Sequence, residues 1–326
     1  MAEVIRVDSI GVEFSINQHY FHAVDDVSFH IHEGETLGLV GESGSGKSVT
    51  SLAIVRLLAK SARVTGTVMY KGRNLLDMTV QEMRQIRGGE ISMIFQEPMT
   101  SLNPVYKIGA QISETLHLHQ RLSKREAHDQ VLGMLKKVGI ARPEEIMNGY
   151  PYQLSGGMRQ RVMIAIAMIC NPSLLIADEP TTALDVTIQA QILRLMKELS
   201  RDYGTSVLLI THDLGVVAEM CDRVAVMYAG QIVEQGTVDD IFFATHHPYT
   251  QGLLKAIPKI DVKIKERLQP IDGNVPAITR MPKGCRFSSR CPYVMERCRS
   301  EAPAFVDIGE RHYSRCWLSA AEGLEK

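Results

Sequence analysis

An eight-residue loop constrains this 326-residue chain more than any other feature. Residues 41–48 read Gly-Glu-Ser-Gly-Ser-Gly-Lys-Ser and fit the pattern G-x-x-x-x-G-K-[ST] at every position. An apolar run at 35–40 precedes the loop, and the stretch 49–58 is apolar around most of its circumference, as a helix buried against a sheet should be. In such a strand–loop–helix unit the glycines let successive backbone N–H groups point at phosphate oxygens, and the helix adds its N-terminal dipole.

The loop therefore predicts a site for Mg²⁺ and a nucleotide. Lys47 would reach the β- and γ-phosphates, and the Ser48 hydroxyl would be a ligand of Mg²⁺. A chance Gly/Ser turn is the alternative, and the flanking strand and helix disfavour it. The residues expected to contact nucleotide are Gly41, Glu42, Ser43, Gly44, Ser45, Gly46, Lys47, Ser48 and Val49. By itself the pattern indicates a P-loop NTPase and nothing narrower.

Polar residues follow two further apolar runs, 174–177 and 207–210, which read as strands buried on both faces of a parallel sheet. Asp178 and Glu179 come after the first run and His212 after the second. Open α/β sheets bind ligands outside the carboxyl ends of their strands. Asp178 could hold Mg²⁺ through water, and Glu179 could orient an attacking water. The alternatives are a solvated acidic pair and a structural histidine.

The segment Leu154-Ser155-Gly156-Gly157-Met158 opens a predicted helix that runs to Cys170. Ser155, Gly156 and Gly157 before a helix N-terminus form a second candidate phosphate-binding element. Ser155 could instead merely cap the helix, and Met158 in place of Glu leaves the capping box incomplete. Two such helix ends more than 100 residues apart make sense if the second one serves another subunit's nucleotide.

Composition and charge limit the classes of protein that this chain can be. It is 45% hydrophobic and 22% charged with a net charge of −1, so no global field attracts nucleic acid or an anionic membrane. The longest apolar run, 162–170, has nine residues, against roughly 20 needed to span a bilayer. No signal peptide is recognised at the N-terminus. These features predict a cytoplasmic protein that reaches a membrane only through a partner.

Local differences in composition predict how the chain divides into domains. Residues 97–170 look mostly helical, including 126–139 and 158–169, and we expect a helical subdomain inserted into an α/β core. A Pro- and Gly-punctuated charged stretch begins at Pro258. We therefore expect one domain over 1–258 and a small extension over 259–326.

Four of the six cysteines fall in that extension, at Cys285, Cys291, Cys298 and Cys316. Without a CxxC pair their spacing is a weak metal signal, so free structural thiols, a zinc site and an iron–sulfur cluster all remain open. Nearby arginines could offset the charge of a thiolate-bound cluster; they are Arg286, Arg290, Arg297, Arg299, Arg311 and Arg315. Cys170 and Cys221 are interpreted as ordinary buried thiols.

The order of loop 41–48, Gln96, 154–157, 174–179, 183–185 and His212 resembles ABC ATPases over about residues 3–255. The resemblance implies a RecA-like core, an antiparallel β subdomain and a helical signature subdomain. It implies that two cassettes sandwich two ATPs, with the loop of one facing Ser155 and Gly157 of the other, so the isolated subunit should be a poor ATPase. Gln96 would couple Mg²⁺ and water to the permease, Glu179 would be the general base, His212 would contact the γ-phosphate, and Asp185 would act across the interface. Phe14 is the expected adenine-stacking aromatic, with Tyr20 or Phe21 as rivals.

Three segments are similar to one branch of that family. Residues 93–104 and 177–187 look like the corresponding segments of dipeptide, oligopeptide and nickel importers, and 247–250 like the start of their C-terminal extension. The resemblance implies a bacterial or archaeal ATPase subunit that energises uptake of dipeptides or short oligopeptides at the cytoplasmic face of the inner membrane. It implies three kinds of partner: a related second ATPase, two integral-membrane permease subunits and an extracytoplasmic peptide-binding protein. It also implies a [4Fe-4S] cluster on the four cysteines, with Zn²⁺ as the alternative. Nickel or another solute, or a soluble non-transport ATPase, are the alternative functions.

Overall fold

The computed structural model describes residues 2–96, 101–182, 184–257, 270–309 and 311–322. Part of the predicted segment 93–104, Ala183 and the predicted domain boundary at Pro258 lie outside the described residues. The chain divides into two compact units. Unit 1 comprises Met1–Ile5, His30–Thr36 and Met69–Ile210, and unit 2 comprises Arg6–Phe29, Leu37–Val68 and Thr211–Lys326.

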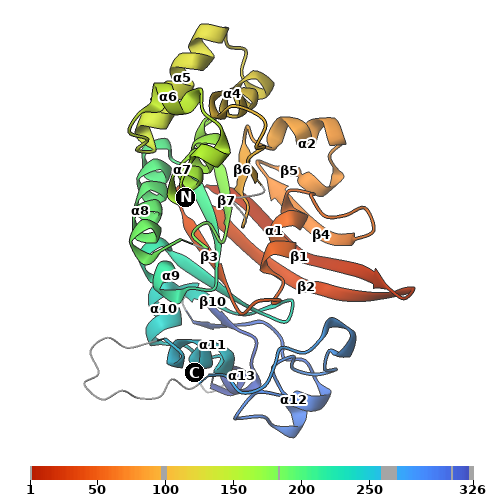
Figure 1. Cartoon of the computed structure of the whole chain (residues 1–326). Helices are drawn as coiled ribbons and strands as arrows, with labels where there is room; N and C mark the ends of the chain where they lie inside the picture. Colours follow the sequence, from red (N-terminus) through yellow and green to blue (C-terminus); the bar gives the residue numbers. More distant parts are fainter. Residues whose placement is uncertain (1, 97–100, 183, 258–269, 310, 323–326) are drawn as a thin grey trace, which may run out of the picture. The chain divides into compact units, whose positions relative to one another are not determined.

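Unit 1 contains three parallel strands with helices after them (Figure 1). β7 pairs with β6 in the register Leu174↔Ile91 and with β8 in the register Leu174↔Ser206. Every residue of β7 and β8 is buried, which confirms the prediction of parallel strands covered on both faces. The strands are β5 (Arg73–Asn74), β6 (Ile91–Ile94), β7 (Leu174–Asp178) and β8 (Ser206–Thr211). The helices are η1 (Leu75–Asp77), α2 (Val80–Ile86), α4 (Ile108–His119), α5 (Lys124–Lys137), α6 (Pro143–Met147), η2 (Pro151–Gln153), α7 (Gly156–Met168) and α8 (Val186–Tyr203).

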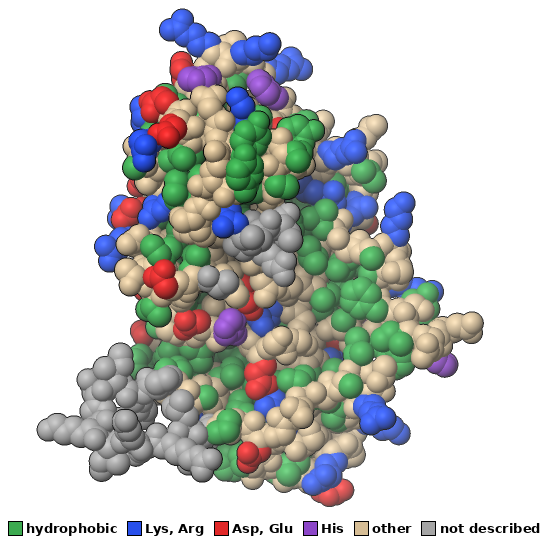
Figure 2. Space-filling model, in the orientation of Figure 1, with side chains coloured by type: hydrophobic (Ala, Val, Ile, Leu, Met, Phe, Trp, Pro, Cys, Tyr) green, Lys and Arg blue, Asp and Glu red, His purple; other side chains and the backbone are tan. Residues whose placement is uncertain are grey.

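Capping residues set the helix starts in unit 1. α5 begins two residues before the predicted 126 because the Ser123 hydroxyl accepts from the Glu126 N–H while the Glu126 carboxylate accepts from the Ser123 N–H. α7 begins two residues before the predicted 158 because Ser155 is its N-cap. Helices α4 to α7 pack together at the top of Figure 1. On the face shown in Figure 2, basic and acidic side chains are interspersed over this end of unit 1.

Unit 2 contains an antiparallel sheet in the order β2–β1–β4 and a second sheet in the order β11–β12–β10–β9–β3. β3 pairs with β9 in parallel, whereas β10 pairs with β9 and with β12 antiparallel. The strands are β1 (Glu3–Ile16), β2 (His19–His32), β3 (Thr36–Val40), β4 (Arg63–Tyr70), β9 (Arg223–Tyr228), β10 (Gln231–Thr237), β11 (Val306–Gly309) and β12 (His312–Ser314). The helices are α1 (Lys47–Ile54), α9 (Leu214–Met220), α10 (Val238–Phe243), α11 (Pro248–Lys255), η3 (Ile278–Arg280), α12 (Glu296–Ser300) and α13 (Trp317–Glu322).

Helix α1 differs from the predicted span of 49–58. It begins at Lys47, inside the phosphate loop, with Gly46 as N-cap at φ 103°. It ends at Ile54, because Arg56 takes the left-handed conformation at φ 53°. The helix therefore starts directly on the loop residues that are expected to contact phosphate.

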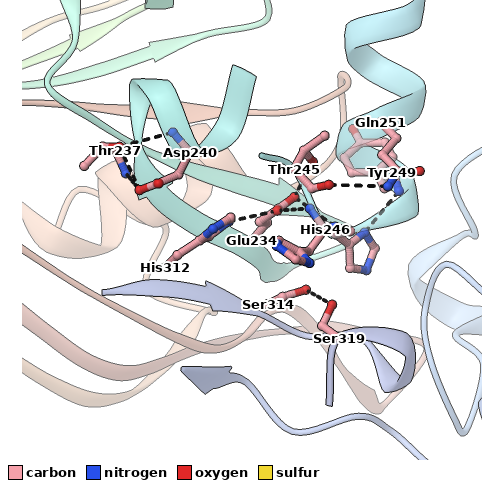
Figure 3. Close-up of polar contacts among 11 residues, drawn as sticks. Glu234, Thr237, Asp240, Thr245, His246, Tyr249, Gln251, His312, Ser314 and Ser319 are labelled. Atoms are coloured by element: carbon pink, nitrogen blue, oxygen red, sulfur yellow. Dashed lines mark hydrogen bonds and ion pairs between the residues drawn. The ribbon is translucent and has the colours of Figure 1, made fainter. Parts of the chain in front are cut away.

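A buried polar network joins β10 to the C-terminal strand β12 (Figure 3). The Glu234 carboxylate lies 3.0 Å from His312 Nε2 and accepts hydrogen bonds from the Thr245 hydroxyl and the His246 N–H. Burial would raise the pKa of Glu234, but the hydrogen bonds from His312 and His246 outweigh it and the pKa is lowered. An ionised carboxylate thus ties β10 and the segment before α11 to β12.

The core of unit 2 also includes the C-terminal extension. Phe287 is 2% exposed and packs in one cluster with Val40, the last residue of β3, and with Tyr228 and Tyr249. Its ring lies 5.2 Å from the Tyr228 ring and 5.5 Å from the Tyr249 ring. The strand before the phosphate loop and the cysteine-bearing segment therefore share one apolar core. Within the described residues, no helix is both long and apolar enough to cross a membrane.

Candidate functional site

The phosphate loop in unit 2 needs glycine at two positions. A Cβ on Gly41, at φ 155°, would lie 2.1 Å from the Met227 carbonyl oxygen. At Gly46 a Cβ would meet the Ala23 carbonyl oxygen at 3.0 Å, again at positive φ. A side chain at either position would push the loop off the neighbouring backbone.

Lys47 is 5% exposed, and its ammonium lies inside the loop. Lys47 Nζ donates to the carbonyl oxygens of Gly41, at 2.7 Å, and Glu42, at 3.0 Å. A buried cation held by carbonyl oxygens among backbone N–H groups is suited to bind an anionic phosphate chain. Ser43 and Gly44 are exposed, while Ser48 and Val49 are half-buried.

Three contacts with distant parts of unit 2 fix the loop. The Glu42 N–H donates to Tyr249 Oη at 2.9 Å, and the Gly230 N–H donates to the Ser45 carbonyl oxygen at 2.8 Å. The Glu42 carboxylate is paired with Arg290. Burial raises the pKa of Tyr249, so its hydroxyl stays protonated. Because these contacts come from the chain itself, the loop conformation is set before any nucleotide binds.

The remaining candidate site residues of unit 2 are His212 and the aromatic residues expected near adenine. His212 is exposed directly after β8, and Phe14 is half-buried on β1. The Tyr20 ring carries the Arg63 guanidinium at 3.5 Å from its centroid, so one face of that ring is covered. Phe14 and Phe21, both half-buried, stay as candidates to stack on adenine.

Unit 1 places Gln96 next to Glu179. Gln96 Nε2 donates to Glu179 Oε2 at 3.1 Å, and the Thr182 hydroxyl donates to the same oxygen at 2.9 Å. Glu179 has φ 47°, a conformation that costs a non-glycine residue about 1–3 kcal/mol. Its N–H donates to the Ile210 carbonyl oxygen at 2.9 Å, which helps to hold it there. Asp178, at the end of β7, is 4% exposed.

The signature residues form the start of α7, with Ser155 as the N-cap and Gly156 as the first helical residue. The Ser155 hydroxyl accepts from the Met158 N–H at 3.3 Å, and Ser155 and Gly156 are exposed. The cap that the sequence offered as an alternative role is therefore present, and it leaves the other N–H groups of the first turn available to a ligand.

Asp185 caps the neighbouring helix in the same way. Its carboxylate accepts from the Ile188 N–H at 3.0 Å, and its side chain is exposed. A Cβ on Gly157 would lie 3.0 Å from Ile188 Cγ2, so the second signature glycine lets α7 approach the start of α8 closely. Unit 1 thus brings the two exposed helix N-termini together.

The four C-terminal cysteines line one pocket with about 330 Å³ of space not filled by atoms, part of it open to solvent. Burial raises the pKa of Cys285 to about 11 and raises the pKa values of Cys291 and Cys316, so these thiols are protonated at neutral pH. Over the described part of the chain, no group of three or more His, Cys, Asp or Glu side chains is arranged to hold a metal ion. The pocket therefore has four sulfur donors but lacks the geometry of a single-ion site.

Most of the arginines near the cysteines in sequence form ion pairs. Four of the six are paired with carboxylates and so are largely neutralised. The pairs are Arg286–Asp25, Arg290–Glu42, Arg297–Glu301 and Arg315–Asp26. These four arginines are therefore ion-pair partners of carboxylates as well as neighbours of the cysteines in sequence.

Two residues that contact the phosphate loop escaped the sequence analysis. Tyr249 lies in segment 247–250, and the sequence indicates Arg290 only as a charge near the cysteines. Each residue is more than 200 positions away in sequence from Glu42, the loop residue that it contacts. No local pattern signals such a contact.

Two family models match the chain. The model described as "ABC transporter" matches residues 24–182. The model described as "Oligopeptide/dipeptide transporter, C-terminal region" matches residues 233–298. The first range includes the loop, Gln96, Ser155 and Glu179, and the second includes Tyr249, Arg290 and three of the four C-terminal cysteines.

Three relatives match the chain over nearly all of its length. The chain is 52% identical to the oligopeptide transport ATP-binding protein AppD of Bacillus subtilis over 100% of both chains. It is 52% identical to the dipeptide transport ATP-binding protein DppD of Bacillus subtilis, over 98% of this chain and 95% of that one. It is 49% identical to the oligopeptide transport ATP-binding protein OppD of Escherichia coli, again over 98% and 95%.

A solved structure shares the cassette fold. The dimeric post-hydrolysis structure of the ATP-binding cassette MJ0796 bound to ADP and Pi has a TM-score of 0.65 and 29% identity. The match covers 72% of this chain and 98% of that one. The remaining part of this chain lies outside what that cassette contains.

Proposed function

Since the chain belongs to the ATP-binding proteins of the oligopeptide and dipeptide ABC transporters, and is the ATP-hydrolysing subunit of a peptide importer, we propose specific roles for its residues. Loop 41–48 binds the phosphates of Mg-ATP, with Lys47 on the β- and γ-phosphates. Ser48 and Gln96 are ligands of Mg²⁺, and Asp178 holds it through water. Glu179 is the general base that activates the attacking water, and His212 contacts the γ-phosphate.

The observation that carries this assignment is the geometry of Glu179. Its backbone is held at φ 47° and its carboxylate accepts from both Gln96 and Thr182. Strained backbone persists where the surrounding structure fixes it, which is common at catalytic positions. A carboxylate oriented in this way by neutral donors is suited to position and deprotonate a water.

We further propose that Ser155, Gly156, Gly157 and Asp185 complete the site of a second ATPase subunit. Ser155, Gly156 and Asp185 are exposed and Gly157 is half-buried, and the four lie at two adjacent helix N-termini, which favour an anionic ligand. The other partners are two permease subunits and an extracytoplasmic peptide-binding protein, so the chain works at the cytoplasmic face of a bacterial or archaeal membrane. The cargo is a dipeptide or short oligopeptide.

Glu179→Gln tests the catalytic assignment in the assembled transporter. We expect ATP binding to persist within about twofold while hydrolysis falls about 100-fold or more, because the general base is lost. Glu198→Gln is the matched control, since Glu198 is exposed on α8 and should leave turnover unchanged. Turnover by Glu179→Gln near the wild-type rate would remove Glu179 from the mechanism. Uptake of dipeptides, longer peptides and nickel chelates by cells lacking the subunit tests the cargo.

We propose that Cys285, Cys291, Cys298 and Cys316 hold a [4Fe-4S] cluster. Four thiols that line one pocket are the donor set of such a cluster. Zn²⁺ on the same thiols is the alternative. When bound, the cluster would cross-link a small extension and supply a redox-active group. Its residues would release their thiol protons on binding, since burial raises the pKa of Cys285 to about 11.

Anaerobic purification tests the cluster. We expect brown protein that contains iron and sulfide, and we expect Cys298→Ser to lose both. Cys170→Ser is the control, because Cys170 does not line the pocket. Colourless protein with stoichiometric zinc would contradict the proposal.

A further inference from the structure

The turn between Cys285 and Cys291 touches two sites at once. Both cysteines line the pocket described above. The turn is compact, since the N–H groups of Arg290 and Cys291 both donate to the Phe287 carbonyl oxygen at 3.0 Å. Its two arginines, each next to a pocket cysteine, point to the phosphate loop and to the hairpin that supports that loop. The proposed cluster site and the ATP site are therefore one turn apart.

Arg290 binds the loop through a two-pronged ion pair. Its Nη1 lies 2.6 Å from Glu42 Oε2 and its Nη2 lies 3.1 Å from Glu42 Oε1. The Arg290 side chain is 4% exposed and that of Glu42 is 30% exposed. Bidentate pairs between guanidinium and carboxylate are among the strongest and most directional polar contacts in proteins.

Arg290 is itself held rigidly. Its Nε donates to the Asp272 carbonyl oxygen at 2.9 Å, and Nη2 donates to the Ile271 carbonyl oxygen at 3.1 Å. The guanidinium thus has five acceptors, namely both Glu42 carboxylate oxygens, the two carbonyl oxygens and Tyr228 Oη, and they fix its position. Movement of the turn would therefore move the carboxylate of Glu42, whose own N–H is fixed by Tyr249.

Arg286 provides a second, indirect route. Its guanidinium pairs with Asp25 and donates to the Ala229 carbonyl oxygen. The next residue, Gly230, donates its N–H to the Ser45 carbonyl oxygen of the loop and accepts from the Asp25 N–H at 2.8 Å. The β9–β10 hairpin thus links the turn to the loop at a second point.

We propose that Arg290 is a positioning residue for the ATP phosphates and that the turn 285–291 couples the state of the cysteine pocket to ATP affinity. The second half rests on the proposed function of the four cysteines. The coupling needs no large motion, since one ion pair joins the turn to loop position 42. By linkage, ATP binding must in turn shift the equilibrium between the states of the pocket, and we expect thiol reactivity to report that shift.

A double-mutant cycle on the full chain tests the positioning role. We expect Arg290→Gln and Glu42→Gln each to weaken ATP binding about tenfold, and the double variant to bind no worse than either, because both remove the same pair. Arg290→Lys keeps the positive charge but cannot make two parallel hydrogen bonds to the carboxylate. Its affinity for ATP should therefore lie between those of the wild type and Arg290→Gln. Calorimetry measures the ATP dissociation constant of each variant, and its melting temperature shows that the variant is folded.

The control for loss of an arginine–glutamate pair is Arg142→Gln. Arg142 pairs with Glu145 on α6, is 79% exposed and should leave ATP affinity within about twofold. Additive effects of Arg290→Gln and Glu42→Gln would overturn the positioning role. So would wild-type affinity in a folded Arg290→Gln protein.

Thiol labelling of the metal-free chain tests the coupling without a cluster. We expect saturating Mg-ATP to slow labelling of Cys285 and Cys291 about threefold or more in the wild type and not in Arg290→Gln. Cys170 in unit 1 is the internal reference, and peptide mass spectrometry separates the sites. Equal rates with and without ATP in the wild type would overturn the coupling. That result would not bear on whether the cluster is present, which the iron and sulfide contents of the purified protein decide.

Discussion

The phosphate loop and the signature segment are both helix N-termini that present backbone N–H groups, yet they are built differently. Loop 41–48 is held within unit 2 by Tyr249, Gly230 and Arg290, and its lysine is buried. In unit 1, Ser155 makes a cap bond to Met158, and Ser155 and Gly156 are exposed. A site that must bind its own nucleotide is pre-organised, whereas a surface that completes another chain's site is left open. Mutations in the phosphate loop should therefore lower ATP affinity, whereas mutations in the signature segment should lower the rate of ATP hydrolysis.

Lys47→Ala is expected to give the largest loss of affinity. The ammonium lies inside the loop, and charged hydrogen bonds are worth about 1.5–3 kcal/mol each, so ATP affinity of the isolated chain should fall about 100-fold or more. Calorimetric titration with Mg-ATP measures the change. Binding within tenfold of wild type would show that the loop backbone alone supplies the affinity.

Ser155→Arg should separate the two regions most clearly. The exposed side chain would fill the space in which another chain's phosphates are expected, so hydrolysis by the assembled transporter should fall about 100-fold. The isolated chain should bind ATP within about twofold of wild type, because Ser155 belongs to unit 1 and not to the loop. A matching loss of affinity in the isolated chain would contradict the distinction.

His247→Asn tests whether the buried imidazole at the start of α11 makes unit 2 sensitive to acid. Burial lowers the pKa of His247 to about 4 from 6.5, so in that window the unfolded chain binds a proton that the folded chain excludes. Stability from the neutral imidazole is therefore complete above pH 6.5 and falls as the pH drops towards 4, by up to about 3 kcal/mol.

Asparagine can still accept the Tyr249 N–H that His247 Nδ1 now accepts at 3.1 Å, but it cannot titrate. We expect the melting temperature of His247→Asn to fall less steeply than that of the wild type between pH 6.5 and 5. Parallel curves for the two proteins would assign the acid sensitivity to other groups.

Tyr249→Phe should have the smallest effect. It leaves the Glu42 N–H without its acceptor, which costs about 1–2 kcal/mol and should weaken ATP binding about threefold to tenfold. Tyr203→Phe is the control, because it removes a hydroxyl that accepts from Lys137 on the surface of unit 1. An unchanged affinity in Tyr249→Phe would mean that Arg290 and Gly230 suffice to fix the loop.

Local patterns predicted the elements and not their long-range supports. The buried strands at 174–177 and 207–210, the loop and the polar residues after each strand follow from apolar runs and glycine placement over a few residues. Helix starts were missed by two residues, where caps at Ser123 and Ser155 decide them. Tyr249 and Arg290 reach the loop across 207 and 248 positions, and nothing in the intervening sequence encodes that geometry. Arg290 was also ambiguous in chemistry, since an arginine beside a cysteine suits an ion pair as well as a cluster.

The pair between Arg290 and Glu42 also has a consequence for the order of events during synthesis. The loop leaves the ribosome early, but its guanidinium partner follows 248 positions later. Until residue 290 has been made, the nascent chain carries a complete phosphate-binding motif without this ion pair. Full ATP affinity is therefore acquired only after residue 290 has folded onto the loop, and a chain truncated before residue 285 should never acquire it.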